Sequence, residues 1–164
     1  MVWVFFDASA LAKRYAPEAG SDFINELFLS FPLTQMQIST IGISEIISVL
    51  VRKQNDGRLP SQLFQQALLE VGDEIINSEA FSFSAVDDQL IFSSQKLIVQ
   101  HNINATDAII LQSCLDLRER LPHEDKLVLL SSDKRLLRAA NNEHLFAFDP
   151  EIASFPEFQE LARA

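Results

Sequence analysis

Two short apolar runs that each lead to an aspartate constrain what this chain can fold into. The first, Val2–Phe6, ends at Asp7, and the second, Leu127–Leu130, is followed by two serines and Asp133. Runs this short are typical of strands that are buried on both faces of a parallel sheet. Such sheets bind ligands at the carboxyl ends of their strands, so both aspartates are expected where a site would be built. Asp7 could equally well cap the helix that follows it.

Strand and helix signals alternate along the rest of the chain. Further strands are expected at Met36–Ser39, Phe81–Phe83 and Leu145–Phe148. Helices are expected over residues 9–15, 21–29, 40–53 and 134–141, and others begin near residues 61, 87 and 105. The alternation predicts an α/β fold with a parallel sheet covered on both faces. One domain is expected over residues 1–150, and residues 151–164 are expected to form a tail of a helical turn or less that packs on the domain or trails it.

Length and composition indicate a globular protein of one domain. The 164 residues are 48% hydrophobic and 22% charged, which is ordinary for this class. No apolar run predicts a membrane span, and the first apolar run lacks the preceding basic region of a signal peptide. The single Cys114 excludes an intramolecular disulfide and fits a reducing compartment. A cytoplasmic location is therefore expected.

The formal net charge of −10 limits how the protein can handle nucleic acid. Binding through bulk electrostatics is disfavoured, because a phosphate backbone needs a cationic surface. Divalent cations held by the acids would reverse the local field and bring phosphates within reach. An acidic surface also suits a basic protein partner.

Two further acids stand in apolar helical segments. Glu45 lies near the start of a mostly apolar helix that Thr40 or Ser44 would cap, and Asp107 lies in the first turn of another. Asp107 shares its helical face with apolar positions three, four and seven residues later. A carboxylate is rarely buried unless it is paired or binds metal, which favours a ligand role for both. Glu45 could instead face solvent or stabilise the helix N-terminus, and Asp107 could be a simple cap.

Gathering four carboxylates at one end of the sheet needs a counter-ion. Two unit charges about 4 Å apart repel by roughly 1 to 4 kcal/mol at surface-like dielectric constants. Mg²⁺ or Mn²⁺ matches carboxylate and water ligands, and such ions activate a water to attack a phosphodiester. No His or Cys pair has the spacing of a zinc site. His101, His123 and His144 are expected to be ordinary surface residues, and Cys114 a core residue.

Residues 7–21, DASALAKRYAPEAGS, resemble the opening of PIN-domain ribonucleases and, more closely, of the VapC-type toxins of bacterial type II toxin–antitoxin modules. Three later segments resemble the family in the same order: Ser44–Ile46, Thr106–Ile109 and Ser132–Leu136. The resemblance implies a three-layer α/β/α sandwich that cleaves RNA with a metal ion and leaves 5′-phosphate and 3′-hydroxyl ends. It also implies a homodimer and a cognate antitoxin, often one that blocks the acidic site with an Arg or Lys side chain.

Carried over by resemblance, the acidic quartet is Asp7, Glu45, Asp107 and Asp133. These four are the expected catalytic residues and the expected ligands of Mg²⁺ or Mn²⁺. Asp7 and Asp107 would hold the principal ion, Glu45 would act directly or through a water, and Asp133 would help to form a second site.

Three other residues are candidates for supporting roles. Ser9 and Thr106 would fix carboxylates by hydrogen bonds or act only as caps. Lys13 would contact a substrate phosphate or lie on a solvated helix face.

Other function classes fit the sequence less well. A phosphatase of the haloacid dehalogenase type needs a second aspartate where Ser9 stands, and the paired acids of a receiver domain are not evident. A catalytically silent PIN-like module that only binds a partner protein is the main alternative.

The chain departs from the family where a glycine often precedes the last strand, because Asn142–His144 stand there.

Overall fold

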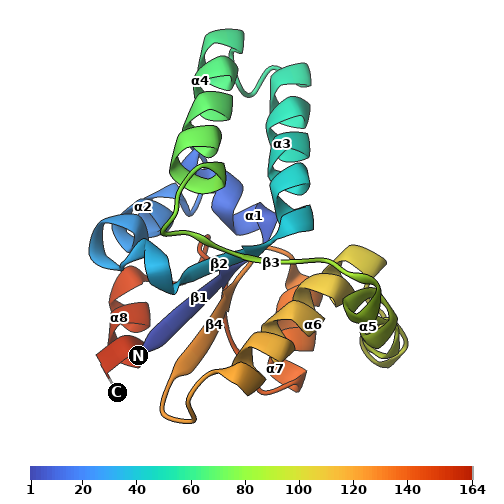
Figure 1. The fold of residues 1–164 in the computed structure, drawn as a ribbon. Helices are drawn as coiled ribbons and strands as arrows, with labels where there is room; N and C mark the ends of the chain where they lie inside the picture. The colour runs from blue at the N-terminus through green and yellow to red at the C-terminus, as the bar shows by residue number, and fades with distance from the viewer. Residues whose placement is uncertain (164) are drawn as a thin grey trace.

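A five-stranded parallel sheet forms the centre of the computed structural model, which describes residues 1–163 (Figure 1). The strands lie in the order β3-β2-β1-β4-β5. The central strand β1 (Val2–Phe6) pairs with β2 (Met36–Ser39) on one side and with β4 (Lys126–Leu130) on the other. Strands β3 (Ser82–Ser84) and β5 (Phe146–Phe148) form the two edges. The predicted parallel sheet is confirmed.

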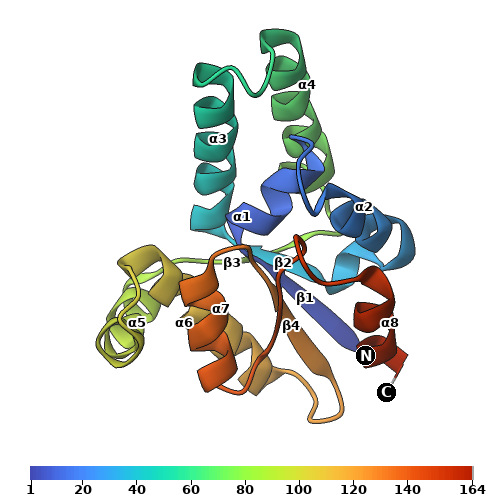
Figure 2. The same ribbon diagram turned by 180° about the vertical axis from the view of Figure 1, so that it is seen from behind.

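Helices cover both faces of this sheet, which confirms the three-layer α/β/α sandwich (Figures 1 and 2). They are α1 (Ala8–Leu11), α2 (Ser21–Ser30), α3 (Thr40–Asn55), α4 (Ser61–Val71), α5 (Asp88–His101), α6 (Ala105–Arg120), α7 (Lys134–Asn142) and α8 (Phe155–Arg163). Short 3-10 turns occupy Ala12–Arg14 and Leu33–Gln35, and a π-helical turn, Gly72–Ile76, extends α4. Helices α5 to α7 lie on one side of the sheet, α2 and α8 lie on the other, and α3 and α4 project together beyond it. Among residues 1–163, no helix combines the length and the apolar character that crossing a membrane requires.

Alternation along the two central strands explains why both faces of the sheet are buried. Val4 and Phe6 of β1 belong to the apolar core beneath α1 to α4 and α8. Phe5 belongs to a second core beneath α6 and α7, together with Leu127 and Leu129 of β4. Each such side chain contributes roughly 1.5–3 kcal/mol when fully buried, so the two cores hold the sheet between the helical layers.

The C-terminal segment contains the nine-residue helix α8, Phe155–Arg163, so the expectation of one helical turn or less was wrong. A capping box starts α8. The Glu157 carboxylate accepts hydrogen bonds from the backbone N–H and the hydroxyl of Ser154, and the Glu157 backbone N–H donates to Ser154 Oγ. Phe155 and Phe158 of this helix are buried and pack edge-on against Phe23 of α2. The helix persists because it covers the outer face of α2 and the sheet.

One histidine, His101, differs from the expected surface role, and His144, which is exposed as expected, has an unusual backbone conformation. His101 at the end of α5 is buried, and its Nε2 lies 2.7 Å from Oε1 of Glu143. His144 has a φ of +59°, which is the left-handed region that favours glycine. His144 therefore takes a backbone conformation that glycine adopts readily, just before β5 begins at Phe146.

Candidate active site

The four predicted acids line one pocket of about 360 Å³ at the carboxyl edge of the sheet. Each comes from a different element: Asp7 follows β1, Glu45 lies in α3, Asp107 lies in the first turn of α6, and Asp133 follows β4. Ser9 also lines the pocket. The parallel sheet brings these acids together because β1 and β4 are neighbours that end at the same edge. Their catalytic and metal-binding roles stay predictions.

Asp7 is held by two serine hydroxyls. Ser9 Oγ and Ser131 Oγ both donate to Asp7 Oδ2, the latter at 2.9 Å. Asp7 also caps α1, so the capping role and the pocket position coexist. Burial raises the pKa of Asp7, although the hydrogen bonds from Ser9 and Ser131 act in the opposite direction. The sequence analysis identified Ser9 but missed Ser131, whose signal is its place between a buried strand and Asp133.

Asp107 is held by Asn104, which the sequence analysis missed. The Asn104 side chain caps α6 by accepting from the Asp107 backbone N–H at 2.8 Å, and its Nδ2 donates to Asp107 Oδ2 at 2.8 Å. Thr106, the residue expected in this role, does not line the pocket and donates no side-chain hydrogen bond within residues 1–163. Burial and the charges of Asp133 and Asp7 raise the pKa of Asp107 to about 6. An Asn three residues before an acid at a helix start was the available signal.

Glu45 has a carboxylate oxygen that nothing in residues 1–163 satisfies. Its Oε2 is buried and has no hydrogen-bond partner. Burial, followed by the charges of Asp7 and Asp107, raises the pKa of Glu45 to about 7. The helix that carries it is capped by Ser39, which accepts from the backbone N–H of residue 42, and not by Thr40 or Ser44 as expected.

Asp133 caps the helix that follows β4. Its Oδ1 accepts from the backbone N–H groups of Arg135 at 2.7 Å and Leu136 at 3.2 Å. Its own backbone N–H donates to Ser131 Oγ at 3.0 Å, so the same serine contacts both aspartates. One hydroxyl therefore links the ends of the two central strands.

The donor set fits a divalent cation that prefers oxygen ligands. All four acids supply carboxylates, and the buried, unpartnered Oε2 of Glu45 is the kind of atom that such an ion satisfies. As the side chains stand, no three His, Cys, Asp or Glu groups in residues 1–163 are arranged to hold an ion. Burial first, and then the charges of the neighbouring acids, raise the pKa values of Glu45 and Asp107, and a bound cation would counter the repulsion among these acids.

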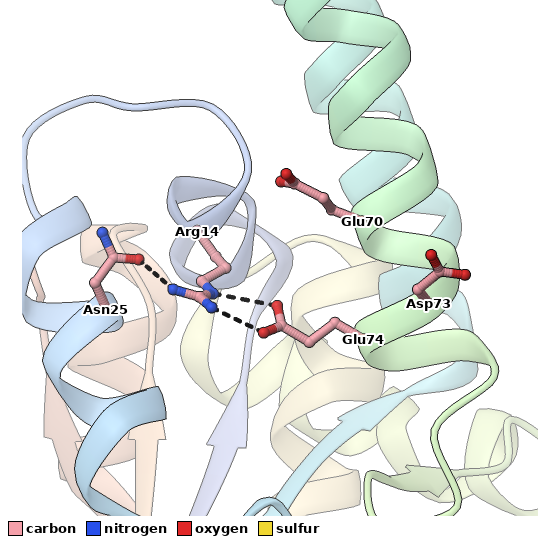
Figure 3. Close-up of a pocket in the computed structure, with 5 residues that line it drawn as sticks. All are labelled: Arg14, Asn25, Glu70, Asp73 and Glu74. Carbon is pink, nitrogen blue, oxygen red and sulfur yellow. Dashed lines mark hydrogen bonds and ion pairs between the residues drawn. The ribbon is translucent and has the colours of Figure 1, made fainter.

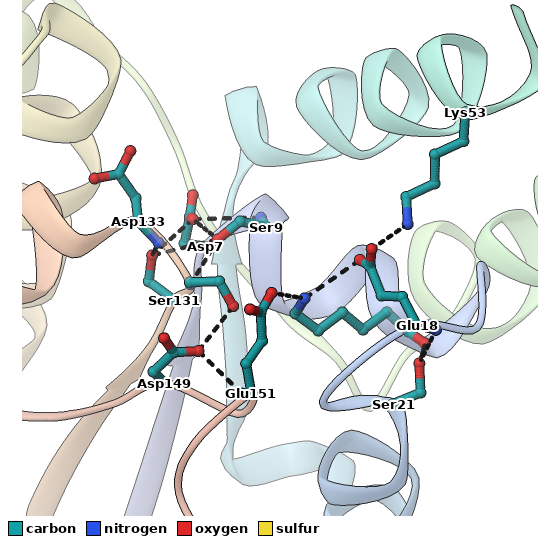
Figure 4. A network of polar contacts seen from close by, with 11 residues as sticks. Asp7, Ser9, Glu18, Ser21, Lys53, Ser131, Asp133, Asp149 and Glu151 are labelled. Atoms are coloured by element: carbon teal, nitrogen blue, oxygen red, sulfur yellow. Dashed lines mark hydrogen bonds and ion pairs between the residues drawn. The ribbon is translucent and has the colours of Figure 1, made fainter. Parts of the chain in front are cut away.

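Lys13 does not lie on a solvated helix face, which was one of its two expected places, and its contact with a substrate phosphate stays a prediction. Its side chain is 2% exposed, and its Nζ lies 2.6 Å from Glu151 and 3.3 Å from Glu18. Glu18 also pairs with Lys53 at 2.5 Å (Figure 4). Lys13 does not line the acidic pocket, because these two glutamates hold its ammonium group elsewhere.

A second and larger pocket, of about 610 Å³, lies away from the quartet. It is lined by Arg14, Asn25, Glu70, Asp73 and Glu74 (Figure 3). Arg14 is already engaged there: it donates to Asn25 at 2.7 Å and forms two hydrogen bonds with Glu74. The quartet pocket, whose acids have raised pKa values and an unpartnered oxygen, is the better candidate for chemistry.

Comparisons with known proteins agree with this fold. The sequence matches the PIN domain family over residues 4–142. No curated protein matches the chain. Among solved structures, FitAcB from Neisseria gonorrhoeae is 15% identical with a TM-score of 0.61, and the alignment covers 92% of this chain and 99% of that one. A toxin–antitoxin complex from Klebsiella pneumoniae is 17% identical with a TM-score of 0.56, covering 90% and 97%. A protein of Pyrobaculum aerophilum is 19% identical with a TM-score of 0.56, covering 99% and 97%.

Proposed function

This chain belongs to the PIN domain family, and we propose that it is a metal-dependent endoribonuclease, the VapC-like toxin of a type II toxin–antitoxin module. One observation carries the proposal. Four carboxylates from four separate elements line one pocket, and one of their oxygens, Glu45 Oε2, is buried with no partner in residues 1–163. A purely structural role does not explain this arrangement, because a buried carboxylate without a partner lowers the stability of the fold.

The quartet would hold Mg²⁺ or Mn²⁺. Asp7 and Asp107 would bind the principal ion, Glu45 would act directly or through a water, and Asp133 would help to form a second site. When bound, such ions activate a water and stabilise the charge that develops on a phosphodiester.

The surrounding residues position these acids. Ser9 and Ser131 fix the Asp7 carboxylate, and Asn104 fixes that of Asp107. Glu45 Oε2 remains free to accept a hydrogen bond from a water. Because each acid sits at a strand end or in a helix, the pocket is held by the packed core and not by a mobile loop.

The proposed partner is a basic antitoxin that inserts an Arg or Lys side chain into the acidic pocket. Two of the structural neighbours are described as a toxin–antitoxin complex and as FitAB bound to a DNA fragment, which supports a module of this kind. We further propose a homodimer that acts on RNA in the cytoplasm.

The proposal is tested by incubating chelator-treated protein with a mixed pool of single-stranded RNA, then adding Mg²⁺ or Mn²⁺. A single-stranded DNA pool of the same sequences tests the choice of nucleic acid. Asp107→Asn is the inactive variant, and Asp88→Asn is its matched control, since Asp88 also lies in the first turn of a helix but is exposed and outside the pocket.

Metal-dependent RNA cuts that Asp88→Asn retains and Asp107→Asn loses are the expected result. Equal cutting by both variants, or cutting in chelator, would contradict the assigned site. Binding to a basic partner without any cleavage would instead favour the silent binding module.

A further inference from the structure

Three basic side chains on the segments that follow Asp7 and Glu45 in the sequence are neutralised by contacts outside the acidic pocket. Arg14 is bonded to Asn25 and Glu74 (Figure 3), while Lys13 and Lys53 are buried in ion pairs with Glu18 or Glu151 (Figure 4). These groups are therefore not free to meet an incoming phosphate. A pocket lined by four acids needs at least one free cation if it is to hold a polyanion in a defined register.

Arg52 is the basic residue that lines the pocket within the part of the chain that the structure describes. It lies on α3, on the same side as Glu45, Ser48 and Val49, which line the pocket too. Its side chain is exposed, and among residues 1–163 it forms no hydrogen bond or ion pair. Its neighbour Lys53 is turned away into the buried pair with Glu18.

We propose that the Arg52 guanidinium binds a phosphate of the RNA beside the scissile bond and thereby positions the strand over the acidic quartet. This inference rests on the proposed ribonuclease function. A guanidinium presents a planar fork of donors that matches two phosphate oxygens, and it keeps its charge at every working pH. Among residues 1–163 the Arg52 side chain forms no hydrogen bond or ion pair, although its charge acts on Glu45, so contact with RNA would break no such bond in the described part of the chain.

The contact is measured first by RNA binding, in an Asp7→Asn background that prevents cleavage while Mg²⁺ is present. Fluorescence anisotropy with a labelled single-stranded RNA compares this protein with the same protein carrying Arg52→Ala or Arg52→Lys. Arg58→Ala is the matched control, because Arg58 is an exposed arginine just beyond α3 that pairs with Asp56 and does not line the pocket.

Arg52→Ala is expected to weaken RNA binding about tenfold. It should also lower the slope of log K against log salt by about 0.7, the value for one phosphate contact to a single strand. Arg52→Lys should keep the slope and regain only part of the affinity, since the charge remains and the fork is lost. In otherwise unaltered enzyme, Arg52→Ala should raise KM more than it lowers kcat.

The two proposals fail in different ways. If the unaltered protein cuts RNA, but Arg52→Ala binds and cuts like Arg58→Ala, the role of Arg52 is overturned and the ribonuclease stands. If the unaltered protein cuts nothing but Arg52→Ala still weakens RNA binding with the expected slope, the phosphate contact stands and the nuclease fails. Absence of RNA binding by Asp7→Asn overturns the role of Arg52.

Discussion

The carboxylates of the acidic pocket and those of the ion pairs of Lys13 and Lys53 have pKa values that are shifted in opposite directions. Figure 4 draws Asp7 and Asp133 from the first group and Glu18 and Glu151 from the second. In the pocket, burial and neighbouring acids raise the pKa values of Glu45 and Asp107. In the ion pairs, partial burial opposes ionisation of Glu18, but the hydrogen bond from Lys53 and the charges of both lysines lower its pKa.

This difference shows that the acids of the ion pairs are neutralised within the protein, whereas those of the pocket lack enough positive charge nearby. The ion-pair cluster carries its own cations, so its contribution is to hold the first helical turns against α3 and the segment after β5. Among the described residues, 1–163, four acids and one arginine line the pocket, so most of its counter-charge would have to come from outside the protein. Substitutions in the pocket should therefore change function more than stability, and substitutions in the ion pairs should do the reverse.

The largest effect is expected for Asp7→Asn. The amide preserves the shape of the side chain and can still accept from Ser9 and Ser131, but it removes a metal-binding charge. We expect RNA cleavage to fall roughly a thousandfold, in line with the loss of a preorganised electrostatic group. The melting temperature in chelator should be unchanged or higher, since burial disfavours the ionised form of Asp7. An unfolded Asp7→Asn protein would show that Asp7 is structural.

Lys13→Met should act on stability. It leaves Glu18 and Glu151 without their shared cation while keeping most of the buried side-chain volume. A loss of about 3 kcal/mol in the free energy of unfolding is expected, at the low end for a broken buried pair because both glutamates keep some contact with water. Urea unfolding measures it, with Lys96→Met on the exposed face of α5 as the control. Cleavage below the melting temperature should change little, and a loss as large as that of Asp7→Asn would contradict the separation of the two clusters.

Two substitutions at Asn104 separate its capping role from its contact with Asp107. Asn104→Ala removes both, and should lower the free energy of unfolding by about 1 kcal/mol. Asn104→Ser keeps a capping oxygen but lacks the donor, so stability should be nearly retained. Both should weaken Mn²⁺ binding about tenfold, as expected when the support of a metal ligand is removed. Calorimetric titration with Mn²⁺ checks this, and unchanged affinity in Asn104→Ser would exclude a positioning role.

The smallest effect concerns the pH dependence of Glu45. Its pKa rises from an ordinary 4.5 to about 7 on folding, so the folded state holds this proton more tightly than the unfolded state. In chelator, ionisation of Glu45 should therefore destabilise the fold increasingly as pH rises from 4.5 through about 7. Glu45→Gln avoids this loss and should be more stable at pH 8 than the unaltered protein by on the order of 1 kcal/mol, after allowing for solvent screening.

The measurement is the difference in melting temperature between the two proteins at pH 5 and pH 8. Other acids with lowered pKa values, such as Glu18, cancel in that difference. Added Mg²⁺ should shrink or reverse it, because the ion favours the ionised carboxylate. A difference that does not grow with pH would show that Glu45 titrates normally in the folded protein.

Local sequence pattern was enough to predict the sheet and to place the four acids at one edge. The signals were strong because buried strands are apolar on both faces, and polar residues at their ends stand out. The supporting residues were harder to identify. Ser131 and Asn104 are residue types that occur at many strand ends and helix starts, and only their contacts with Asp7 and Asp107 mark them as part of the pocket.

The predictions that Lys13 could lie on a solvated helix face and that the C-terminal segment forms one turn or less were wrong for two different physical reasons. Lys13 follows the first acid on what reads as a solvated turn, but its burial depends on Glu151, which lies 138 residues further along the chain. No local pattern contains that contact. The sequence does contain a start signal for α8, because Ser154 and Glu157 have the spacing of a capping box. A segment this short is a stable helix only when it packs on the rest of the protein, and local pattern does not show that packing.

The pairing of β1 with β4 also determines when the pocket can exist. Val2 pairs with Lys126 and Phe6 with Leu130, so the central strand can pair with this neighbour only after residues 126–130 have been made. A ribosome that adds roughly 5–20 residues each second exposes Asp7 and Glu45 several seconds before Asp133 can join them. Until β4 has been made, the nascent chain contains Asp7 and Glu45 but lacks the strand pairing that brings them close to Asp133. The pocket is therefore completed only after β4 has been made, when the chain has extended well beyond most of the residues that line the pocket.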